Sequence, residues 1–125
     1  MILDSCFLID LMAGDERAVA KLDELVAESR PLAVSALSVT EVERGLTDDE
    51  RTQFDAVVAD VDVVAYDRAM ARRAAGVLRA LDADGSPIGA VDAMVATTAL
   101  ERDGAVVTRN VSEFRRVDGV RAIPY

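Results

Sequence analysis

The sequence predicts an α/β fold, a three-layer α/β/α sandwich around a short, mostly parallel central sheet of four to five strands. Short apolar runs of strand length alternate along the chain with segments whose apolar residues recur at helical spacing. Because a helical segment separates successive strands, the strands are expected to pair in parallel, with helices on both faces of the sheet. The chain has 125 residues, of which 51% are hydrophobic and 30% charged, and this composition is typical of one globular domain.

The first 29 residues predict a strand followed by two helices. Residues 1–3 form a short apolar run that ends at Asp4, and the mostly apolar segment 6–12 follows as a short helix. The segment 15–29 is amphipathic, and Asp15 stands in a position suited to the helix N-cap. Its apolar residues at helical spacing are Val19, Leu22, Leu25 and Val26.

The middle of the chain predicts two strands with two helices between them. Residues 32–34 are a short apolar run after a proline, and Ser38 is expected to begin a helix that ends near Gly45. A second helix is expected over 48–59. The valine-rich run 61–64 is expected to be the third strand.

The last part of the chain predicts two long helices, two strands and a helical turn. Asp67 is suited to cap a helix that reaches Leu81. The segment 89–102 has almost no polar face, so this helix is expected to lie buried in the core. The remaining elements are a strand, a short helical turn and an edge strand, over 105–107, 111–115 and 121–123.

Missing residue types restrict the chemistry of the chain. It has no histidine and a single cysteine, Cys6, which excludes an intrachain disulfide, the usual zinc sites and any triad that uses histidine. Catalysis would therefore use carboxylates, hydroxyls or a metal that prefers oxygen ligands. We expect Cys6 itself to be a small, buried apolar side chain.

The charge and hydropathy of the chain bear on its surroundings. The 14 Lys and Arg against 23 Asp and Glu give a net charge of −9, which counts against nucleic-acid binding unless arginines cluster locally. No apolar run approaches the roughly 18 residues that cross a bilayer, and Asp4 comes too early for a cleavable secretory segment. We therefore expect a cytoplasmic protein that does not contact a membrane.

Acidic side chains lie at several expected strand ends and helix starts, and each has a structural explanation. Asp4 and Asp92 suit the N-termini of helices, where a carboxylate favourably meets the helix dipole. Glu41 would complete a capping box with Ser38. Helical spacing does not distinguish Glu41 from Glu43 as the inward carboxylate.

Together these acids predict more than helix caps. Asn110 and Glu113, a further capping pattern, lie beyond the fourth expected strand, and a parallel fold brings such positions to the sheet edge where Asp4 and Asp92 lie. Two carboxylates about 4 Å apart repel by roughly 4 kcal/mol at an effective dielectric near 20, so a fold rarely gathers several without a cation. Ligation by oxygen alone selects Mg²⁺ or Mn²⁺. Such an ion lowers the pKa of bound water and stabilises charge on a phosphoryl group, which predicts phosphodiester hydrolysis without histidine.

Four segments of the chain resemble the acidic motifs of PIN-domain ribonucleases, in the order of that family. They are 1–6 (MILDSC), 38–46 (SVTEVERGL), 89–96 (GAVDAMVA) and 107–114 (VTRNVSEF). The length and the motifs are most similar to those of VapC toxins from toxin–antitoxin pairs. The resemblance implies a single PIN domain over 1–125 that is a Mg²⁺-dependent endoribonuclease, with Mn²⁺ as an alternative ion, and that hydrolyses RNA by metal-activated water. It also implies a homodimer that a VapB-type antitoxin inhibits.

The same resemblance assigns the site residues. The residues that match the catalytic positions are Asp4, Glu41, Asp92, Asn110 and Glu113. The first three match the metal-binding carboxylates, and it is the resemblance that selects Glu41 over Glu43. Asn110 stands where many members of the family have aspartate, so Glu113 is included as a source of the fourth carboxylate. Cys6 stands where asparagine or serine is commoner.

Polar side chains around these motifs are candidates for substrate contacts. They are Ser5, Thr108, Arg109, Arg115 and Arg116. The two hydroxyls are suited to orient the carboxylates or a metal-bound water, although local turn bonding explains them equally well. The three arginines flank the fourth motif and are candidates for binding phosphate. A second group, Arg68, Arg72 and Arg79, shares one helix face, which we expect to be solvated and paired with aspartates.

Other classes of function remain open from the sequence. Asn110 at an acidic position is compatible with a non-catalytic binding module of the same fold. An RNA-processing PIN-domain protein outside a toxin–antitoxin pair is a further alternative. A phosphoacceptor receiver domain has the same length and alternation, but it resembles a site with a late lysine at a strand end, and the only lysine here is Lys21.

Overall fold

Five short strands form one sheet at the centre of the computed structural model, which describes all residues from 1 to 125. They are β1 (Ile2–Leu3), β2 (Ala33–Ser35), β3 (Asp62–Val64), β4 (Ala105–Val107) and β5 (Arg121–Ile123). The strand order is β3-β2-β1-β4-β5, and every neighbouring pair is parallel. The predicted α/β class is confirmed, and the sheet is wholly rather than mostly parallel because β5 also joins its neighbour in parallel.

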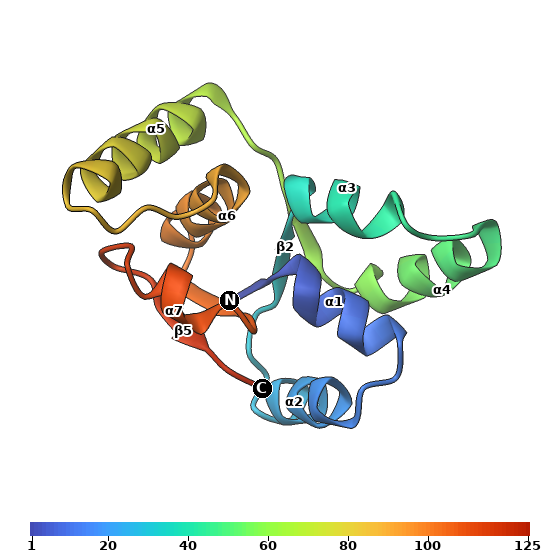
Figure 1. Cartoon of the computed structure of the whole chain (residues 1–125). Helices are drawn as coiled ribbons and strands as arrows, with labels where there is room; N and C mark the ends of the chain where they lie inside the picture. Colours follow the sequence, from blue (N-terminus) through green and yellow to red (C-terminus); the bar gives the residue numbers. More distant parts are fainter.

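Seven helices surround the sheet. They are α1 (Ser5–Met12), α2 (Glu16–Ala27), α3 (Ala36–Glu43), α4 (Asp48–Val58), α5 (Arg68–Ala83), α6 (Ala90–Leu100) and α7 (Val111–Phe114). Figure 1 shows α5 and α6 together on one side of the sheet and α1 to α4 on the other. This is the predicted three-layer arrangement.

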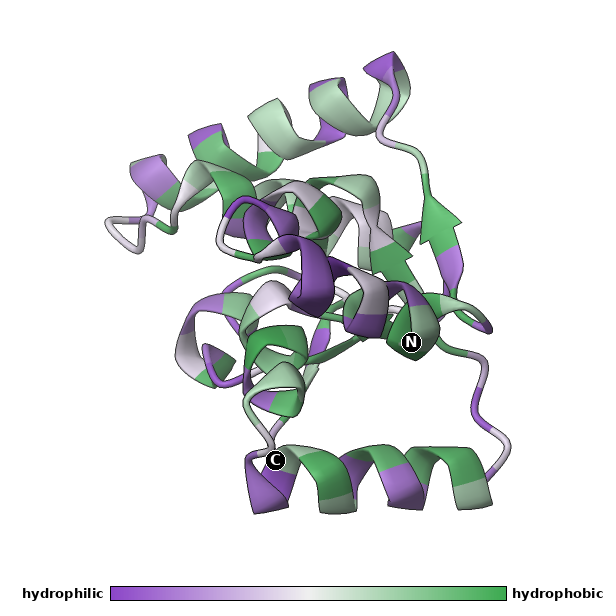
Figure 2. Ribbon diagram, turned by 90° about the vertical axis from the view of Figure 1, so that its right-hand side faces the viewer, coloured by the Kyte–Doolittle hydropathy of each residue, from purple (hydrophilic) through white to green (hydrophobic).

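The strand sequences explain why both faces of the sheet are covered. Along β4, Ala105 and Val107 enter one core with Phe7 of α1, whereas Val106 between them enters a second core with Val95 of α6. A strand buried on both faces must be apolar throughout, as β4 is. The outer helices are amphipathic instead, and Figure 2 shows hydrophilic and hydrophobic stretches alternating along them.

Helix α6 is buried in the core, as its lack of a polar face predicts. Residues Val95 to Ala99 are all buried. The hydroxyls of Thr97 and Thr98 donate to the carbonyls of Ala93 and Met94, so no polar group of these two side chains is left unpaired. No helix in the structure combines the length and the apolar character needed to cross a bilayer.

Helix α3 begins earlier than the sequence predicts. The Ser35 hydroxyl accepts a backbone N–H of the first turn at 3.2 Å, so Ser35 rather than Ser38 is the N-cap. Ser38 and Glu41 lie inside the helix, and the capping box predicted for them is wrong. The capping box of this region joins Thr47 and Glu50 at the start of α4. Pairing of β2 with β3 continues to Ser35 and thereby fixes where α3 starts.

Candidate functional site

Asp4 lies at the carboxyl end of β1, and only 3% of its surface is exposed. Its Oδ1 accepts the backbone N–H of Ser5 at 2.9 Å, so Asp4 is the N-cap of α1. Its Oδ2 accepts the hydroxyl of Thr108 at 2.7 Å and the thiol of Cys6 at 3.3 Å. None of these donors is a cation. A buried carboxylate therefore stands at this edge of the sheet without a basic partner.

The end of β4 supplies a partner of Asp4 because β4 is the neighbour of β1 in the sheet. Thr108 follows β4 and is fully buried. Its hydroxyl donates to Asp4 and accepts the backbone N–H of Asn110 at 3.0 Å. The sulfur of Cys6 accepts the backbone N–H of Arg109 at 3.3 Å. The first and fourth motifs are thereby joined into one hydrogen-bonded unit.

Two side chains of this unit differ from the sequence expectation. Cys6 is half-buried and makes polar contacts, so the expectation of a buried apolar side chain is wrong. Its place in the first turn of α1 brings the thiol to the carboxylate that caps that helix. Ser5 contributes its backbone N–H to Asp4, and its hydroxyl makes no hydrogen bond.

Asp92 lies in the first turn of α6 and is half-buried. Burial, a side-chain hydrogen bond with Glu113 and the negative charges of Asp4, Glu113 and Glu41 raise the pKa of Asp92 to about 7. These causes place Asp92 within reach of the carboxylates of all three other motifs. The fold therefore brings the predicted acidic residues into one electrostatic neighbourhood.

These carboxylates do not form a closed cage. No three Asp, Glu or Cys side chains converge closely enough to hold one ion directly. Asp4, Glu41 and Asp92, predicted as joint ligands, therefore share a neighbourhood but no direct coordination shell. Mg²⁺ usually keeps several waters and is bound through one or two carboxylates, so the arrangement fits a hydrated ion.

The pairing of polar groups gives one further observation that fits a divalent cation with its water shell. None of the chain's seven ion pairs involves Asp4, Glu41, Asp92 or Glu113. The hydroxyl of Ser38, one turn before Glu41 on α3, is fully buried and is the one buried side-chain polar atom without a hydrogen-bond partner. Leaving such a group unpaired costs about 1–3 kcal/mol. The unpaired carboxylates are accounted for by a hydrated cation, whereas no contact in the structure ties the Ser38 hydroxyl to them.

The two candidates in the fourth motif are placed differently. Asn110 precedes α7 but makes no side-chain capping bond, so the capping interpretation of this pair is wrong. Its side chain is exposed. Glu113 is half-buried, and its carboxyl group contacts Asp92. Only Glu113 therefore joins the acidic cluster.

The candidate phosphate-binding arginines are all exposed. Arg109 pairs with Asp10 at 3.2 Å, and Arg116 donates to the carbonyl of Pro87 at 2.7 Å. Arg115 makes no ion pair and no side-chain hydrogen bond. Of the three guanidinium groups, that of Arg115 is the one free to meet a ligand.

The arginine group on α5 is exposed, as expected, but it is not paired. Arg68, Arg72 and Arg79 make no ion pair, so the predicted pairing with aspartates is wrong. The only acid on this helix is Asp82. Asp82 follows Arg79 by three residues and is its neighbour on the helix, but an exposed pair gains so little free energy that the two side chains stay apart.

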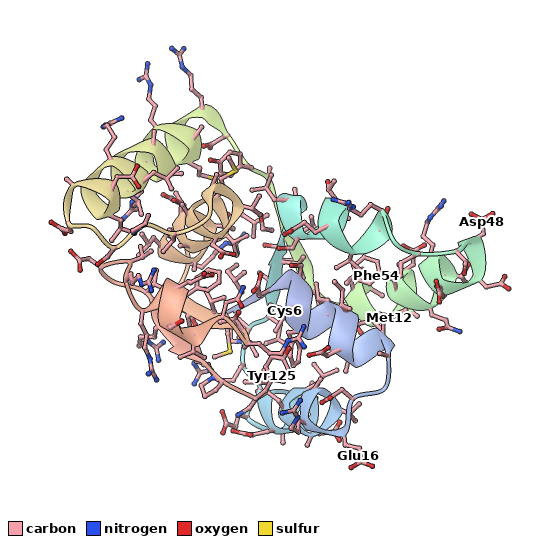
Figure 3. The ribbon with its side chains drawn as sticks, viewed as in Figure 1. Cys6, Met12, Glu16, Asp48, Phe54 and Tyr125 are labelled. Carbon is pink, nitrogen blue, oxygen red and sulfur yellow. The ribbon has the colours of Figure 1, made fainter.

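Two contacts near the site involve residues that no sequence motif singles out. Tyr125 donates its hydroxyl to Asp10 at 2.7 Å, and its ring meets Phe7 edge-on with centroids 4.9 Å apart. Burial, followed by this hydrogen bond, raises the pKa of Tyr125 above its usual range. Figure 3 places Tyr125 beside α1, on the side where Cys6 is labelled. Residue 125 is thus fastened next to the first motif.

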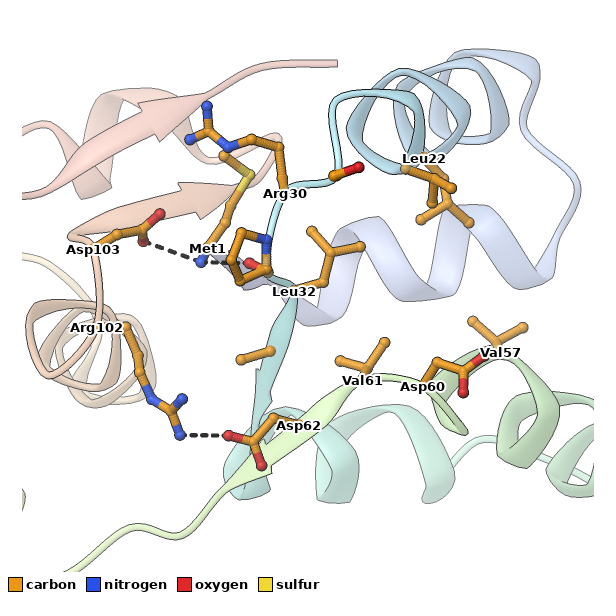
Figure 4. A pocket seen from close by; sticks show the side chains of 14 residues that line it. Met1, Leu22, Arg30, Leu32, Val57, Asp60, Val61, Asp62, Arg102 and Asp103 are labelled. Carbon is orange, nitrogen blue, oxygen red and sulfur yellow. Dashed lines mark hydrogen bonds and ion pairs between the residues drawn. The ribbon is translucent and has the colours of Figure 1, made fainter.

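The largest hollow of the molecule, about 830 Å³, lies elsewhere. It opens at the amino ends of the strands, between α2 and the turn that follows α4, and contains none of the predicted acidic residues. Figure 4 shows its two ion pairs, Met1 with Asp103 and Arg102 with Asp62. Carboxylate chemistry, and not cavity size, therefore identifies the candidate site.

Comparison with known proteins gives the family to which these features correspond. Residues 1–120 match the sequence model of the PIN domain. The chain is 32% identical over 116 residues to ribonuclease VapC10 of Mycobacterium tuberculosis, a match that covers 91% of this chain and 85% of that protein. It is 37% identical over 68 residues to the tRNA(fMet)-specific endonuclease VapC of Shigella flexneri, which covers 54% of this chain and about half, 52%, of that relative.

Solved structures share the fold. The crystal structure of VapBC2 from Rickettsia felis, bound to a DNA fragment from their promoter, contains a chain that superposes with a TM-score of 0.85 at 17% sequence identity. The alignment covers 99% of this chain and 97% of that one.

Proposed function

The chain belongs to the PIN domain family, in its VapC branch, and on this premise we propose that it is a Mg²⁺-dependent endoribonuclease, with Mn²⁺ as the alternative ion. The observation that supports the proposal is the environment of Asp92, whose carboxyl group lies beside that of Glu113 and within electrostatic reach of Asp4 and Glu41, with no basic side chain to balance these charges. Carboxylates that repel one another are kept close together in a folded chain where a bound cation offsets the repulsion. The chain has no histidine, so no imidazole can act as the general base.

In this proposal Asp4, Glu41 and Asp92 hold the ion, directly or through water, and Glu113 supplies the fourth carboxylate. When bound, the cation supplies Lewis-acid activation of water and stabilises charge on the phosphoryl group. Asp4 is held in place by its three donors and presents one fixed carboxylate to the site. In the metal-free chain Asp92 and Glu113 share a hydrogen bond, and this bond places the carboxyl group of Glu113 beside the proposed ligand Asp92.

Substrate contacts are assigned to the exposed groups that surround this edge. Arg115 has no internal partner and is proposed to meet an RNA phosphate, with Arg109 and Arg116 beside it. Asn110 is proposed to contact the substrate, because its exposed amide makes no bond within the chain. Ser5 remains a candidate through its unbonded hydroxyl, whereas that of Thr108 is committed to Asp4.

We further propose an antitoxin of the VapB type and a second copy of this chain as partners. Phe7 and Leu8 are buried in the core and are not available for either contact. The exposed apolar side chains of the first two helices are Ile9, Val19 and Val26. Ile9 also lines a shallow hollow between α1 and α4, together with Met12 and Leu46. These surfaces support the partner proposal because exposed apolar groups gain free energy when a partner covers them.

Cleavage of full-length RNA tests the catalytic part of this proposal. We expect cleavage with Mg²⁺, none with EDTA, and none by Asp4→Asn with Mg²⁺. Asp62→Asn is the matched control, because it removes an exposed carboxylate at the opposite edge of the sheet and should cleave like the wild type. If the wild type is as inert with Mg²⁺ as with EDTA, the chain is a non-catalytic PIN-domain protein instead.

The toxin part is tested in cells. Expression of the chain should arrest growth, and co-expression of a VapB-type antitoxin encoded beside its gene should relieve the arrest. Growth that continues despite active enzyme in the RNA assay would assign the chain to RNA processing outside a toxin–antitoxin pair.

A further inference from the structure

The thiol of Cys6 joins two motifs that lie about a hundred residues apart in the chain. Its sulfur lies 3.3 Å from Oδ2 of Asp4, 3.5 Å from the hydroxyl of Thr108 and 3.3 Å from the backbone nitrogen of Arg109. The donors in this cluster are determined by counting hydrogens. The hydrogen on Thr108 Oγ1 is directed to Asp4 at 2.7 Å, so Thr108 does not donate to the sulfur. The S–H of Cys6 is then the donor, and Oδ2 of Asp4 is the nearer and the charged one of its two acceptors.

We propose that Cys6 is a positioning residue that fixes the carboxylate of Asp4 for cation binding, an inference that rests on the proposed function. A carboxylate offers about four lone-pair sites. One on Oδ1 accepts the N–H of Ser5, and both on Oδ2 accept the hydrogens of Thr108 and Cys6. One acceptor site therefore remains, and it belongs to Oδ1.

Cys6 also couples this carboxylate to the loop after β4. Because its sulfur accepts the N–H of Arg109, the residue that follows Thr108, the same side chain holds both Asp4 and the loop that supplies the second donor to Asp4. An alanine at this position would remove the donor to Oδ2 and leave the Arg109 N–H without its acceptor. A serine would keep one donor and one acceptor at this position, on a smaller side chain.

Binding of Mn²⁺, measured by calorimetry or by the paramagnetic signal of the free ion, tests this inference without using catalysis. Removing a group that orients a metal ligand typically weakens metal binding about 10–100-fold. A thiol is a weak donor, so we expect Cys6→Ala to weaken Mn²⁺ binding about tenfold and Cys6→Ser to stay within about twofold of the wild type. Ser112→Ala, which removes an exposed hydroxyl without a hydrogen bond, is the control and should bind like the wild type.

A second measurement uses the wild type alone, so it does not depend on the variants folding. The chain has one thiol, and its S–H stretching band in the infrared therefore reports on Cys6 only. We expect the band at the lowered frequency of a hydrogen-bonded S–H, and a shift towards the free-thiol frequency in Asp4→Ala. A wild-type band at the free-thiol frequency would overturn the proposed contact.

The outcomes separate this inference from the proposed function. If the wild type and Cys6→Ala bind Mn²⁺ equally well and both cleave RNA, Cys6 has only a packing role and the nuclease assignment stands. If the wild type binds no Mn²⁺ and cleaves no RNA, both proposals fall. Weak binding by Cys6→Ala that Cys6→Ser does not restore would also overturn the role of the hydrogen bonds.

Discussion

The two edges of the sheet differ in whether their charged groups have oppositely charged partners. At the amino edge the N-terminal ammonium of Met1 pairs with Asp103 at 3.1 Å, and Arg102 pairs with Asp62. At the carboxyl edge four carboxylates stand near one another, and none has a basic partner. The charged side chains of the amino edge are paired within the chain, whereas the carboxylates of the carboxyl edge have no basic partner, which supports the proposed cation.

Two aspartates, one at each edge, show this difference in the direction of their pKa shifts. Burial acts to raise the pKa of Asp103, but the N–H of Ala105 and the N-terminal ammonium outweigh it, so the pKa is lowered. Burial also raises the pKa of Asp92, and there the neighbouring acids add to the effect until it reaches about 7. Aspartates in one fold are therefore shifted in opposite directions according to the charge of their neighbours.

The largest expected effect is on catalysis at the carboxyl edge. Glu41→Gln should lower kcat about 1000-fold, because the cation contributes several kcal/mol of charge stabilisation and each 1.4 kcal/mol is tenfold in rate. Single-turnover cleavage of RNA in saturating Mg²⁺ measures this. Glu43→Gln on the same helix is the matched control and should stay within about twofold. Equal losses in the two variants would contradict the assignment of Glu41.

A smaller effect is expected on stability when the cation is added. Mg²⁺ at about 100 times its dissociation constant should raise the free energy of unfolding by about 2.7 kcal/mol, because it binds the folded chain only. Urea unfolding with and without Mg²⁺ measures the gain. Asp4→Asn should lose most of the gain and Asp62→Asn none of it. A gain that persists in Asp4→Asn would place the cation away from the carboxyl edge.

The pH dependence of the metal-free protein gives the next effect. The folded-state pKa of Asp92, about 7, lies above its ordinary value of 3.8, so its contribution to stability is fully present below about pH 4 and is lost as the pH rises through 7. Asp92→Asn removes that loss. In EDTA the variant should be more stable than the wild type by about 1–2 kcal/mol at pH 8, after allowance for solvent screening of a half-buried group.

Near pH 4 the two proteins should be equally stable. Thermal unfolding at a series of pH values measures the difference, and a constant difference at all pH values would show that the substitution acts through packing instead.

The smallest effect is expected at the amino edge. Arg102→Ala removes the pair with Asp62, whose two side chains are 42% and 57% exposed. Such pairs contribute about 0–1 kcal/mol and are screened by salt. Urea unfolding at low and high ionic strength should show a loss below about 1 kcal/mol that shrinks as salt is added. A loss that salt does not change would assign Arg102 a packing role.

Much of the fold follows from local patterns, but the start of α3 does not. The positions of the strands follow from short apolar runs with polar residues or turns beside them. Ser35 and Ser38 are both good caps by residue type, and the choice between them depends on how far β2 pairs with β3, which is a tertiary contact.

In the candidate site, too, some features follow from the sequence pattern and others depend on tertiary contacts. That acids at strand ends meet at one edge follows from parallel pairing, and the environment of Asp92 agrees with it. The hydrogen bonds of Cys6 depend instead on β1 lying beside β4, an order that the sequence pattern does not specify. The contact of Glu113 with Asp92 likewise depends on how the short helix α7 packs against α6.

The hydrogen bond from Thr108 to Asp4 spans 104 positions of the chain. A ribosome that has synthesised only the first hundred residues holds a polypeptide in which β1 lacks one of its two neighbours and Asp4 lacks its strongest donor. The proposed site therefore cannot form until Thr108 has been synthesised, so the order of synthesis delays its assembly by about a hundred residues after Asp4.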